Sequence, residues 1–164
     1  MTVDLDRHVY GPVDAPLTVI EYGDFECPYC GAAAPVLRKL IDGADGAARM
    51  IFRHFPVFSK HPFALTAALA AEASGERFWA MHDLLFTNQD RLTDADLAVY
   101  AETAGVEGAV TGDAVQVHRE AVEADYDQAV IDGVRGTPTI FVNGRLYQGR
   151  LELGTLRAAL GLRH

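Results

Sequence analysis

Two cysteines, the only ones in the 164-residue chain, lie two residues apart in the sequence Cys27-Pro28-Tyr29-Cys30. A Cys-x-x-Cys pair at a junction between a strand and a helix is typical of thiol–disulfide redox centres. Side chains at this spacing lie on one face of a helix, so the two sulfurs can form and break a disulfide without moving the fold. The sequence therefore predicts that Cys27 attacks a substrate disulfide and that Cys30 resolves the resulting mixed disulfide.

The flanking residues supply the strand and the helix that this chemistry needs. Residues 18–22 form an apolar run that predicts a buried strand, and a helix-forming segment begins at Pro28. Because the first turn of a helix has unpaired N–H groups and a partial positive charge, a thiolate at Cys27 is favoured there. Pro28 suits the first helical position, where its fixed φ helps and its missing N–H costs nothing.

Structural roles for the cysteine pair are less well supported by the sequence than a redox role. A structural disulfide closing so short a loop would contribute only about 2 kcal/mol. A structural zinc ion needs four ligands, and the six histidines, at positions 8, 54, 61, 82, 118 and 164, show no paired ligand spacing. Zinc shared across a dimer and a pair of inert buried thiols remain as alternatives. We expect no metal, and no flavin or nucleotide motif is present.

Composition narrows the class of protein and its partners. The length predicts one domain, and the hydrophobic fraction of 49% and charged fraction of 23% are those of an ordinary globular protein. A net charge of −9 without any Lys/Arg run argues against nucleic-acid binding. The longest apolar run is too short for a membrane segment. We expect a monomer or weak dimer.

The amino-terminal residues predict a location. They lack a basic stretch followed by an apolar one, so we expect a cytoplasmic protein without a signal peptide. An extracytoplasmic location stays open if a leader has been removed. In a reducing cytosol a lone cysteine pair is more often catalytic than structural.

The order of elements predicts an α/β fold. Strands at 18–22 and 49–54 flank a helix at 28–41, and Asn143-Gly144 joins the strands of a hairpin. A helix at 152–160 ends the chain. Four helices, expected at 62–74, 76–88, 93–104 and 111–131, separate the two strand-bearing ends. Thr93 and Asp96 predict a capping box at the start of the third of these helices.

Five segments together resemble the DsbA-like subfamily of the thioredoxin superfamily, in the subgroup with a short helical insertion. They are Gly11-Pro-Val-Asp-Ala-Pro16, Glu21-Tyr-Gly-Asp-Phe-Glu-Cys-Pro-Tyr-Cys30, Arg53-His-Phe-Pro56, Phe78-Trp-Ala-Met-His-Asp-Leu-Leu-Phe86 and Val134-Arg-Gly-Thr-Pro-Thr-Ile-Phe-Val-Asn-Gly144. The resemblance implies a thioredoxin fold, with a mixed central sheet flanked by helices. It also implies a single domain over 1–164, with thioredoxin parts at about 17–58 and 134–163 and a helical insertion at about 62–132, between β-α-β and β-β-α halves.

The resemblance also assigns roles beside the cysteines. It implies that Pro138 follows a cis peptide bond and faces the cysteine pair, and that the backbone next to it pairs with an extended substrate peptide. Thr137 should lie against Cys27. We therefore expect Pro28, Tyr29, Thr137 and Pro138 to bind substrate.

Glu21 stands inside the first predicted strand, where an unpaired buried carboxylate would be costly. Related proteins carry an acid at the matching position, below the cysteines, that relays protons to the inner cysteine. The resemblance thus implies that Glu21 is the general base for Cys30. The alternative is a solvent-facing glutamate on an edge strand. Arg53 is expected as its charge partner.

The remaining residues near the pair bear on its chemistry. Asp24 and Glu26 are expected to be exposed and to raise the pKa of Cys27. Strongly oxidising relatives carry histidine between the cysteines, whereas Tyr29 cannot supply a positive charge. We therefore expect a reduction potential below the roughly −120 mV of DsbA, toward about −200 to −230 mV. An apolar rim for unfolded segments is expected from Tyr22, Phe25, Tyr29 and Phe58.

The sequence thus predicts a thiol–disulfide oxidoreductase acting on protein or peptide thiols and disulfides, recycled by a thiol reductant or oxidant. A glutaredoxin-like enzyme that uses glutathione is one alternative, because glutaredoxins share the Cys-Pro-Tyr-Cys motif. A redox-sensing docking module for a partner protein is another. Similar domains occur fused to membrane transporters, and this chain resembles a free-standing version.

Overall fold

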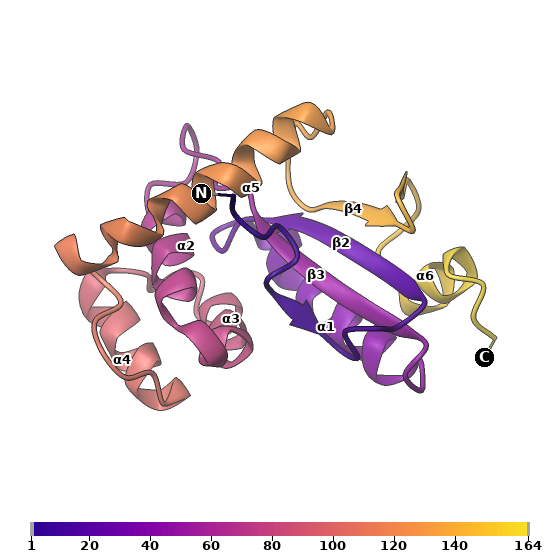
Figure 1. Cartoon of the computed structure of the whole chain (residues 1–164), viewed down its shortest axis with the longest axis horizontal. Coiled ribbons are helices and arrows are strands. Elements are labelled where there is room, and N and C mark those ends of the chain that lie inside the picture. The colour runs from indigo at the N-terminus through magenta and orange to yellow at the C-terminus, as the bar shows by residue number, and fades with distance from the viewer. Residues whose placement is uncertain (1, 164) are drawn as a thin grey trace.

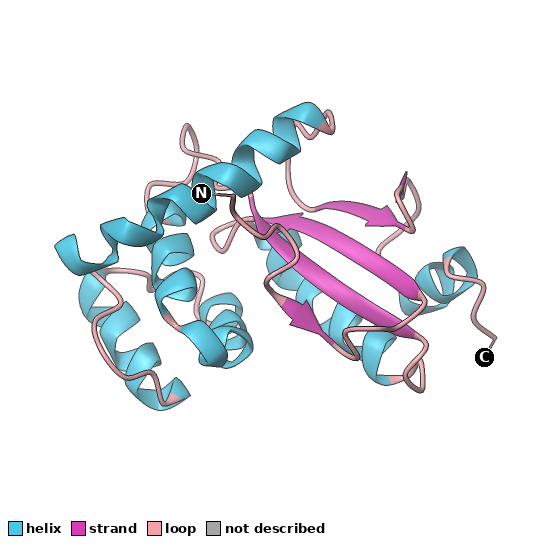
Figure 2. Cartoon of the chain, in the orientation of Figure 1, coloured by secondary structure: helices cyan, strands magenta, loops and turns pink. Residues whose placement is uncertain are grey.

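A mixed five-stranded sheet forms the centre of the computed structural model, which describes residues 2–163 (Figures 1 and 2). The strands are β1 (Val9–Tyr10), β2 (Leu17–Gly23), β3 (Ala48–His54), β4 (Thr139–Val142) and β5 (Arg145–Leu146). Their order is β1-β3-β2-β4-β5, with β2 and β3 parallel and every other neighbouring pair antiparallel. The expected mixed sheet of a thioredoxin fold is confirmed.

Six α-helices and two 3₁₀ turns complete the described part of the chain. They are α1 (Pro28–Asp42), α2 (Ala64–Ala73), η1 (Gly75–Arg77), α3 (Phe78–Thr87), α4 (Asp94–Ala104), η2 (Asp113–His118), α5 (Arg119–Ile131) and α6 (Leu153–Ala159). Helices α2, α3 and α4 gather beside the sheet, while α5 runs from them back toward β4 (Figure 1). Within residues 2–163, no helix combines the length and the apolar character needed to cross a membrane.

Alternation along the strands divides the core between the two faces of the sheet. Val19 on β2 faces α1 and α6 and packs with Leu37 and Leu156. Tyr22 points to the opposite face, where it packs with Ala129 of α5. A third cluster joins the cysteines to the helical insertion, because Cys27 and Cys30 pack in the same cluster as residues of α2, α3 and α4. Helices α2, α3 and α4, which lie in the segment predicted as a helical insertion, therefore form one wall of the cysteine site.

Local signals in the sequence account for several elements. The Thr93 side chain accepts from the Asp96 N–H, and the Asp96 side chain accepts from the Thr93 N–H, which confirms the capping box. Asn143 and Gly144 have φ values of 49° and 82°, as a type I′ turn requires, so the hairpin is confirmed. The structure differs from the predicted elements in two places. Residues 113–118 form a 3₁₀ turn before α5, and the lead segment contributes β1.

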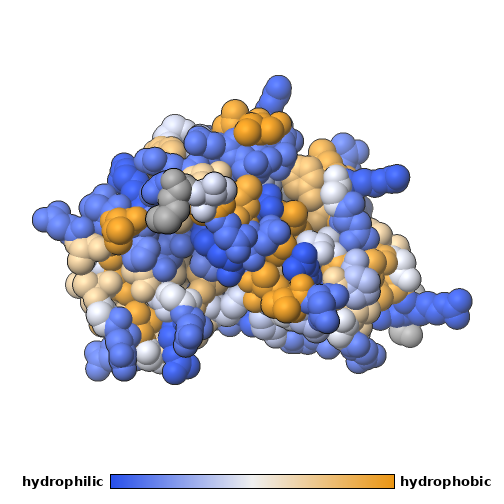
Figure 3. All heavy atoms as spheres, in the orientation of Figure 1, coloured by the Kyte–Doolittle hydropathy of each residue, from blue (hydrophilic) through white to orange (hydrophobic). Residues whose placement is uncertain are grey.

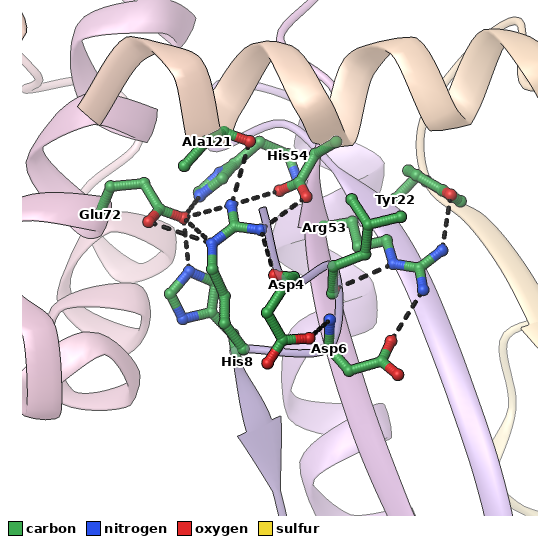
Figure 4. Close-up of polar contacts among 11 residues, drawn as sticks. Asp4, Asp6, His8, Tyr22, Arg53, His54, Glu72 and Ala121 are labelled. Carbon is green, nitrogen blue, oxygen red and sulfur yellow. Dashed lines mark hydrogen bonds and ion pairs between the residues drawn. The ribbon is translucent and has the colours of Figure 1, made fainter. Parts of the chain in front are cut away.

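Arg7, just before β1, holds the amino-terminal segment onto the helical insertion. Figure 4 shows the polar contacts that converge on Glu72 in this region. Its guanidinium donates to Glu72 of α2, at 2.6 Å for the shortest contact, and to both carboxylate oxygens of Asp125 on α5 at 2.8 Å. His8 and His54 each place Nε2 on the same Glu72 oxygen, at 2.5 and 3.0 Å. These buried charges tie together four segments that are distant in the sequence.

Two histidines and a carboxylate also form the kind of cluster that can bind a metal ion. The ligand atoms of His8, His54 and Glu72 all lie within 4.8 Å of one another, a convergence that their spacing in the sequence did not indicate. Arg7 already binds the carboxylate with its positive charge, which disfavours a divalent cation at the same oxygens. The cluster is better described as a buried charge network.

Two exposed apolar residues, Val130 and Ile131, lie at the end of α5. Figure 3 shows an apolar patch over this end of the helix, on a face where apolar and hydrophilic areas alternate. The expected division into one domain with a helical insertion stays a prediction.

Candidate active site

The two cysteines lie at the start of α1, directly after β2 and a short turn. Cys27 is the N-cap and Pro28 the first helical residue, as expected, and the Cys27 N–H donates to the Asp24 carbonyl at 3.0 Å. The two cysteines are free thiols in this structure. Cys27 is 3% exposed and Cys30 fully buried, so only Cys27 can be reached from solvent.

Electrostatics separate the two thiols. The hydrogen bond from the Cys30 thiol contributes most to a pKa of about 5 for Cys27, helped by the Thr137 side chain and the first-turn N–H groups of Cys30 and Tyr29, against the opposing effect of burial. Burial, the bond to Cys27 and the charge of Glu21 raise the pKa of Cys30 well above its usual range. At neutral pH these shifts favour a thiolate at Cys27 and a thiol at Cys30.

The segment before β4 lies against Cys27. The Thr137–Pro138 peptide bond is cis, which confirms that expectation. The Thr137 carbonyl oxygen lies 3.4 Å from Cys27 Sγ, so Thr137 contacts the thiol through its backbone as well as its side chain. A groove of about 230 Å³ beside it is lined by Tyr29, Pro138 and Tyr147 among others. Tyr29 is 73% exposed and free to contact a bound chain.

Glu21 lies on β2, between β3 and β4 in the sheet and on the face covered by α1. In register, its neighbours are Phe52 and Ile140, which offer no hydrogen bond to a carboxylate. Both carboxylate oxygens are buried without a hydrogen-bond partner in residues 2–163. Burial, together with the charge of Cys27, raises the pKa of Glu21 to about 8. The alternative of a solvent-facing edge residue is therefore wrong.

Arg53 is not the charge partner of Glu21. In the parallel register Arg53 is opposite Tyr22, one residue beyond Glu21, so its side chain points to the other face of the sheet. There it donates to the Tyr22 hydroxyl at 2.8 Å and to Asp6 at 2.9 Å. The period-two alternation of strands, applied to both strands together, is the signal that would have excluded this pair.

Asp24 is buried, contrary to the expectation that it is exposed. Its carboxylate accepts hydrogen bonds from the backbone N–H of Glu26 and Val57 and lies 2.7 Å from His61 Nδ1, so it shapes the turn before the cysteines. Glu26 is half-buried and accepts from the Phe63 N–H.

The predicted apolar rim is only half present. Tyr22 and Phe25 belong to the buried core, whereas Tyr29 and Phe58 are exposed. The sequence reading also missed Gln89, whose side chain reaches the cysteine turn from the helical insertion. No local signal identifies it, because it lies 62 residues from Cys27.

Comparison with known proteins agrees with this site. A family model described as thioredoxin matches residues 4–161, and the chain belongs to that family. The Na⁺/H⁺ antiporter NhaA 1 of Salinispora arenicola is 47% identical over 163 residues, which cover 96% of this chain and 25% of the antiporter. The chain thus spans about a quarter of the length of this curated relative.

Solved structures share the fold over nearly the whole chain. The thiol-disulfide exchange protein α-DsbA2 of Wolbachia pipientis has a TM-score of 0.82 and 21% identity, covering 96% of this chain and 87% of that one. A periplasmic thioredoxin-like protein of Salmonella enterica serovar Typhimurium has a TM-score of 0.79 and 23% identity, covering 96% and 90%. The expected thioredoxin fold, in the form seen in DsbA-like structures, is confirmed by these findings.

The expected cytoplasmic location is wrong. The matches point away from it, because one structural neighbour is described as periplasmic and the curated relative is named as an antiporter. The expectation rested on the amino-terminal residues alone, and the thioredoxin fold with its cysteine pair serves equally well outside the cytoplasm.

Proposed function

We propose that the protein exchanges disulfides with protein or peptide thiols through a Cys27/Cys30 dithiol couple. The observation that carries the proposal is the opposite shift of the two thiols, with the pKa of Cys27 lowered to about 5 and that of Cys30 raised. The groove beside Pro138 and the exposed ring of Tyr29 support binding of an extended chain next to the nucleophile. Strand addition beside Pro138 would supply backbone hydrogen bonds.

The proposed reaction is two successive thiolate displacements. The Cys27 thiolate attacks a substrate disulfide, a Cys27–substrate disulfide forms and one substrate thiolate leaves. In molecules where Glu21 is deprotonated, Cys30 gives its proton to that carboxylate and attacks Cys27 Sγ, which forms the Cys27–Cys30 disulfide and releases the second substrate thiolate. The substrate is reduced by two electrons and the cysteine pair is oxidised. In the reverse direction, protonated Glu21 returns the proton to Cys30 as it leaves.

Titration of the couple against a glutathione redox buffer tests this proposal. A pKa of about 5 for Cys27 lies between the thiolates of DsbA, at about 3.5, and thioredoxin, at about 7. We therefore expect a reversible couple near −200 mV, between the potentials of those proteins. The absence of any reversible couple would contradict the proposal and favour the inert-thiol alternative.

Replacing Cys30 by serine separates the dithiol mechanism from the glutathione-dependent alternative. We expect Cys30→Ser to lose turnover on protein disulfides and to accumulate a mixed disulfide at Cys27, detectable by mass spectrometry under non-reducing conditions. Turnover with glutathione that survives this change would instead indicate a glutaredoxin-like monothiol reaction. Cys27→Ser, the matched control, should form no mixed disulfide.

A redox-sensing docking module remains a second candidate, supported by the match to a quarter of an antiporter chain. Redox-dependent binding to a partner protein, with negligible turnover on generic disulfides, would favour this candidate. A recycling reductant or oxidant is required only if the couple turns over.

A further inference from the structure

Gln89 makes a direct polar contact between the helical insertion and the cysteine turn through its side chain. It lies in the connection between α3 and α4, and its side chain is half-buried. The amide nitrogen Nε2 donates to the carbonyl oxygen of Phe25 at 2.9 Å and to that of Cys27 at 2.7 Å. Both hydrogens of the NH₂ group are thereby used, and since both partners can only accept, the nitrogen must face them.

These two carbonyls bracket the turn that places the nucleophile. The Cys27 carbonyl also accepts the Gly31 N–H at 3.0 Å, an early backbone hydrogen bond of α1. Gln89 therefore fastens the backbone on both sides of Glu26 to the insertion, at the point where the helix begins. The position of Cys27 Sγ relative to the first-turn N–H groups depends on that backbone.

Gly31 gives independent evidence that the amide is closely fitted. A Cβ at Gly31 would lie 2.3 Å from Oε1 and 2.8 Å from Cδ of Gln89, which is closer than side chains can approach. An alanine at this position would push the amide away from the two carbonyls, because the far end of a glutamine side chain moves more easily than the helix backbone. The small residue on α1 thus makes room for the contact.

We propose that Gln89 is a positioning residue for Cys27, holding the cysteine turn so that the Cys30 thiol and the first N–H groups of α1 stabilise the thiolate. The inference rests on the proposed role of Cys27 as nucleophile. It also makes the helical insertion a part of the redox site, because the position of one amide from the insertion affects how stable the reduced form is.

The test compares Gln89→Ala with wild type by two measurements: the pH dependence of Cys27 alkylation by iodoacetamide, and the equilibrium with glutathione. Loss of the amide should raise the alkylation midpoint and shift the equilibrium toward a less oxidising couple. The acid dissociation constant of Cys27 and the equilibrium constant with glutathione should each change by about two- to tenfold, which corresponds to the net contribution of a hydrogen bond. Gln116→Ala, an exposed glutamine of η2, is the matched control and should change neither value.

Two further variants exclude a merely structural effect. Gln89→Glu keeps the shape of the side chain, but at neutral pH its carboxylate faces two carbonyl oxygens and cannot donate to them. The alkylation midpoint and the glutathione equilibrium should therefore shift at least as far as in Gln89→Ala. Gly31→Ala should cause a similar shift in the wild-type background and none in the Gln89→Ala background, because the amide is then already gone. Additive effects of the two changes, or variants that lose stability with both thiol measurements unchanged, would overturn the inference.

Wild type itself separates failure of this inference from failure of the proposed function. If Cys27 in wild type shows no titration below pH 7 and no glutathione couple, the proposed function fails. If wild type titrates near pH 5 and Gln89→Ala titrates at the same pH, the dithiol function stands and only the positioning role of Gln89 is lost.

Discussion

Replacing Glu21 by glutamine should make the reduced protein gain stability relative to wild type as the pH rises. The pKa of Glu21 is raised from 4.5 to about 8, so the folded state holds a proton that the unfolded chain releases. The free energy of unfolding of wild type therefore falls as the pH rises from 4.5 to 8. In the variant this contribution is absent, because glutamine does not ionise. Between pH 5 and 9 the difference should grow by about 4 kcal/mol, measured by urea unfolding.

The control for this measurement is Glu107→Gln, because Glu107 is exposed and should show no such trend. A Glu21→Gln curve parallel to that of wild type would show that Glu21 is not held in its protonated form. Because glutamine also needs partners for its amide in the same buried place, the pH dependence is the diagnostic quantity rather than the stability at any single pH.

The same variant tests the proton relay. If Glu21 takes the proton of Cys30, resolution of the mixed disulfide should slow by about 100-fold in Glu21→Gln, at the lower end of general acid–base effects. The dependence of this rate on a group titrating near pH 8 should also disappear. Unchanged pH dependence of Cys30 attack or release in rapid-quench experiments would rule out the relay, whatever the unfolding result.

Replacing Arg7 by methionine should destabilise the fold by about 3–5 kcal/mol. The Arg7 side chain is 17% exposed, while those of its partners Glu72 and Asp125 are 6% and 0% exposed, so the change leaves two carboxylates buried without their cation. Equilibrium unfolding in urea at pH 7 measures the loss. Arg150→Met is the matched control, because Arg150 is 84% exposed in a 3.7 Å surface pair and should cost less than about 1 kcal/mol.

The pH dependence of the Arg7 effect has a definite sign. Burial alone would raise the pKa of Glu72. Hydrogen bonds from His54, His8 and Arg7 outweigh burial and hold this pKa well below its usual range. The stabilisation is therefore complete above about pH 4.5 and is lost as the pH falls further. In Arg7→Met, Glu72 should take up a proton more readily, so the gap from wild type should narrow in acid. A loss as small as that of Arg150→Met would contradict the role of Arg7 as the cation of this network.

The chemistry at the cysteines and the order of elements could be predicted from the sequence, because both depend on local signals. The strand before Cys27, Pro28 at the first helical position, the Thr93 capping box and the Asn143-Gly144 turn each act within a few residues of chain. The fold class follows from their order. The resemblance added the cis bond at Pro138, for which the local sequence holds no signal.

Which side chains meet around the site depends on how the elements pack. Register and strand alternation place Glu21 between Phe52 and Ile140 and send Arg53 to the opposite face, so the carboxylate is left buried without a partner. Gln89 reaches the cysteine turn from 62 residues away, and Arg7 reaches Asp125 across 118. Contacts over such distances leave no periodic or local pattern, because they arise only when packing brings separate elements together. The chemistry open to the Cys27–Cys30 pair follows from residues next to one another in the chain, whereas the acidity of the pair depends on surroundings that packing alone assembles.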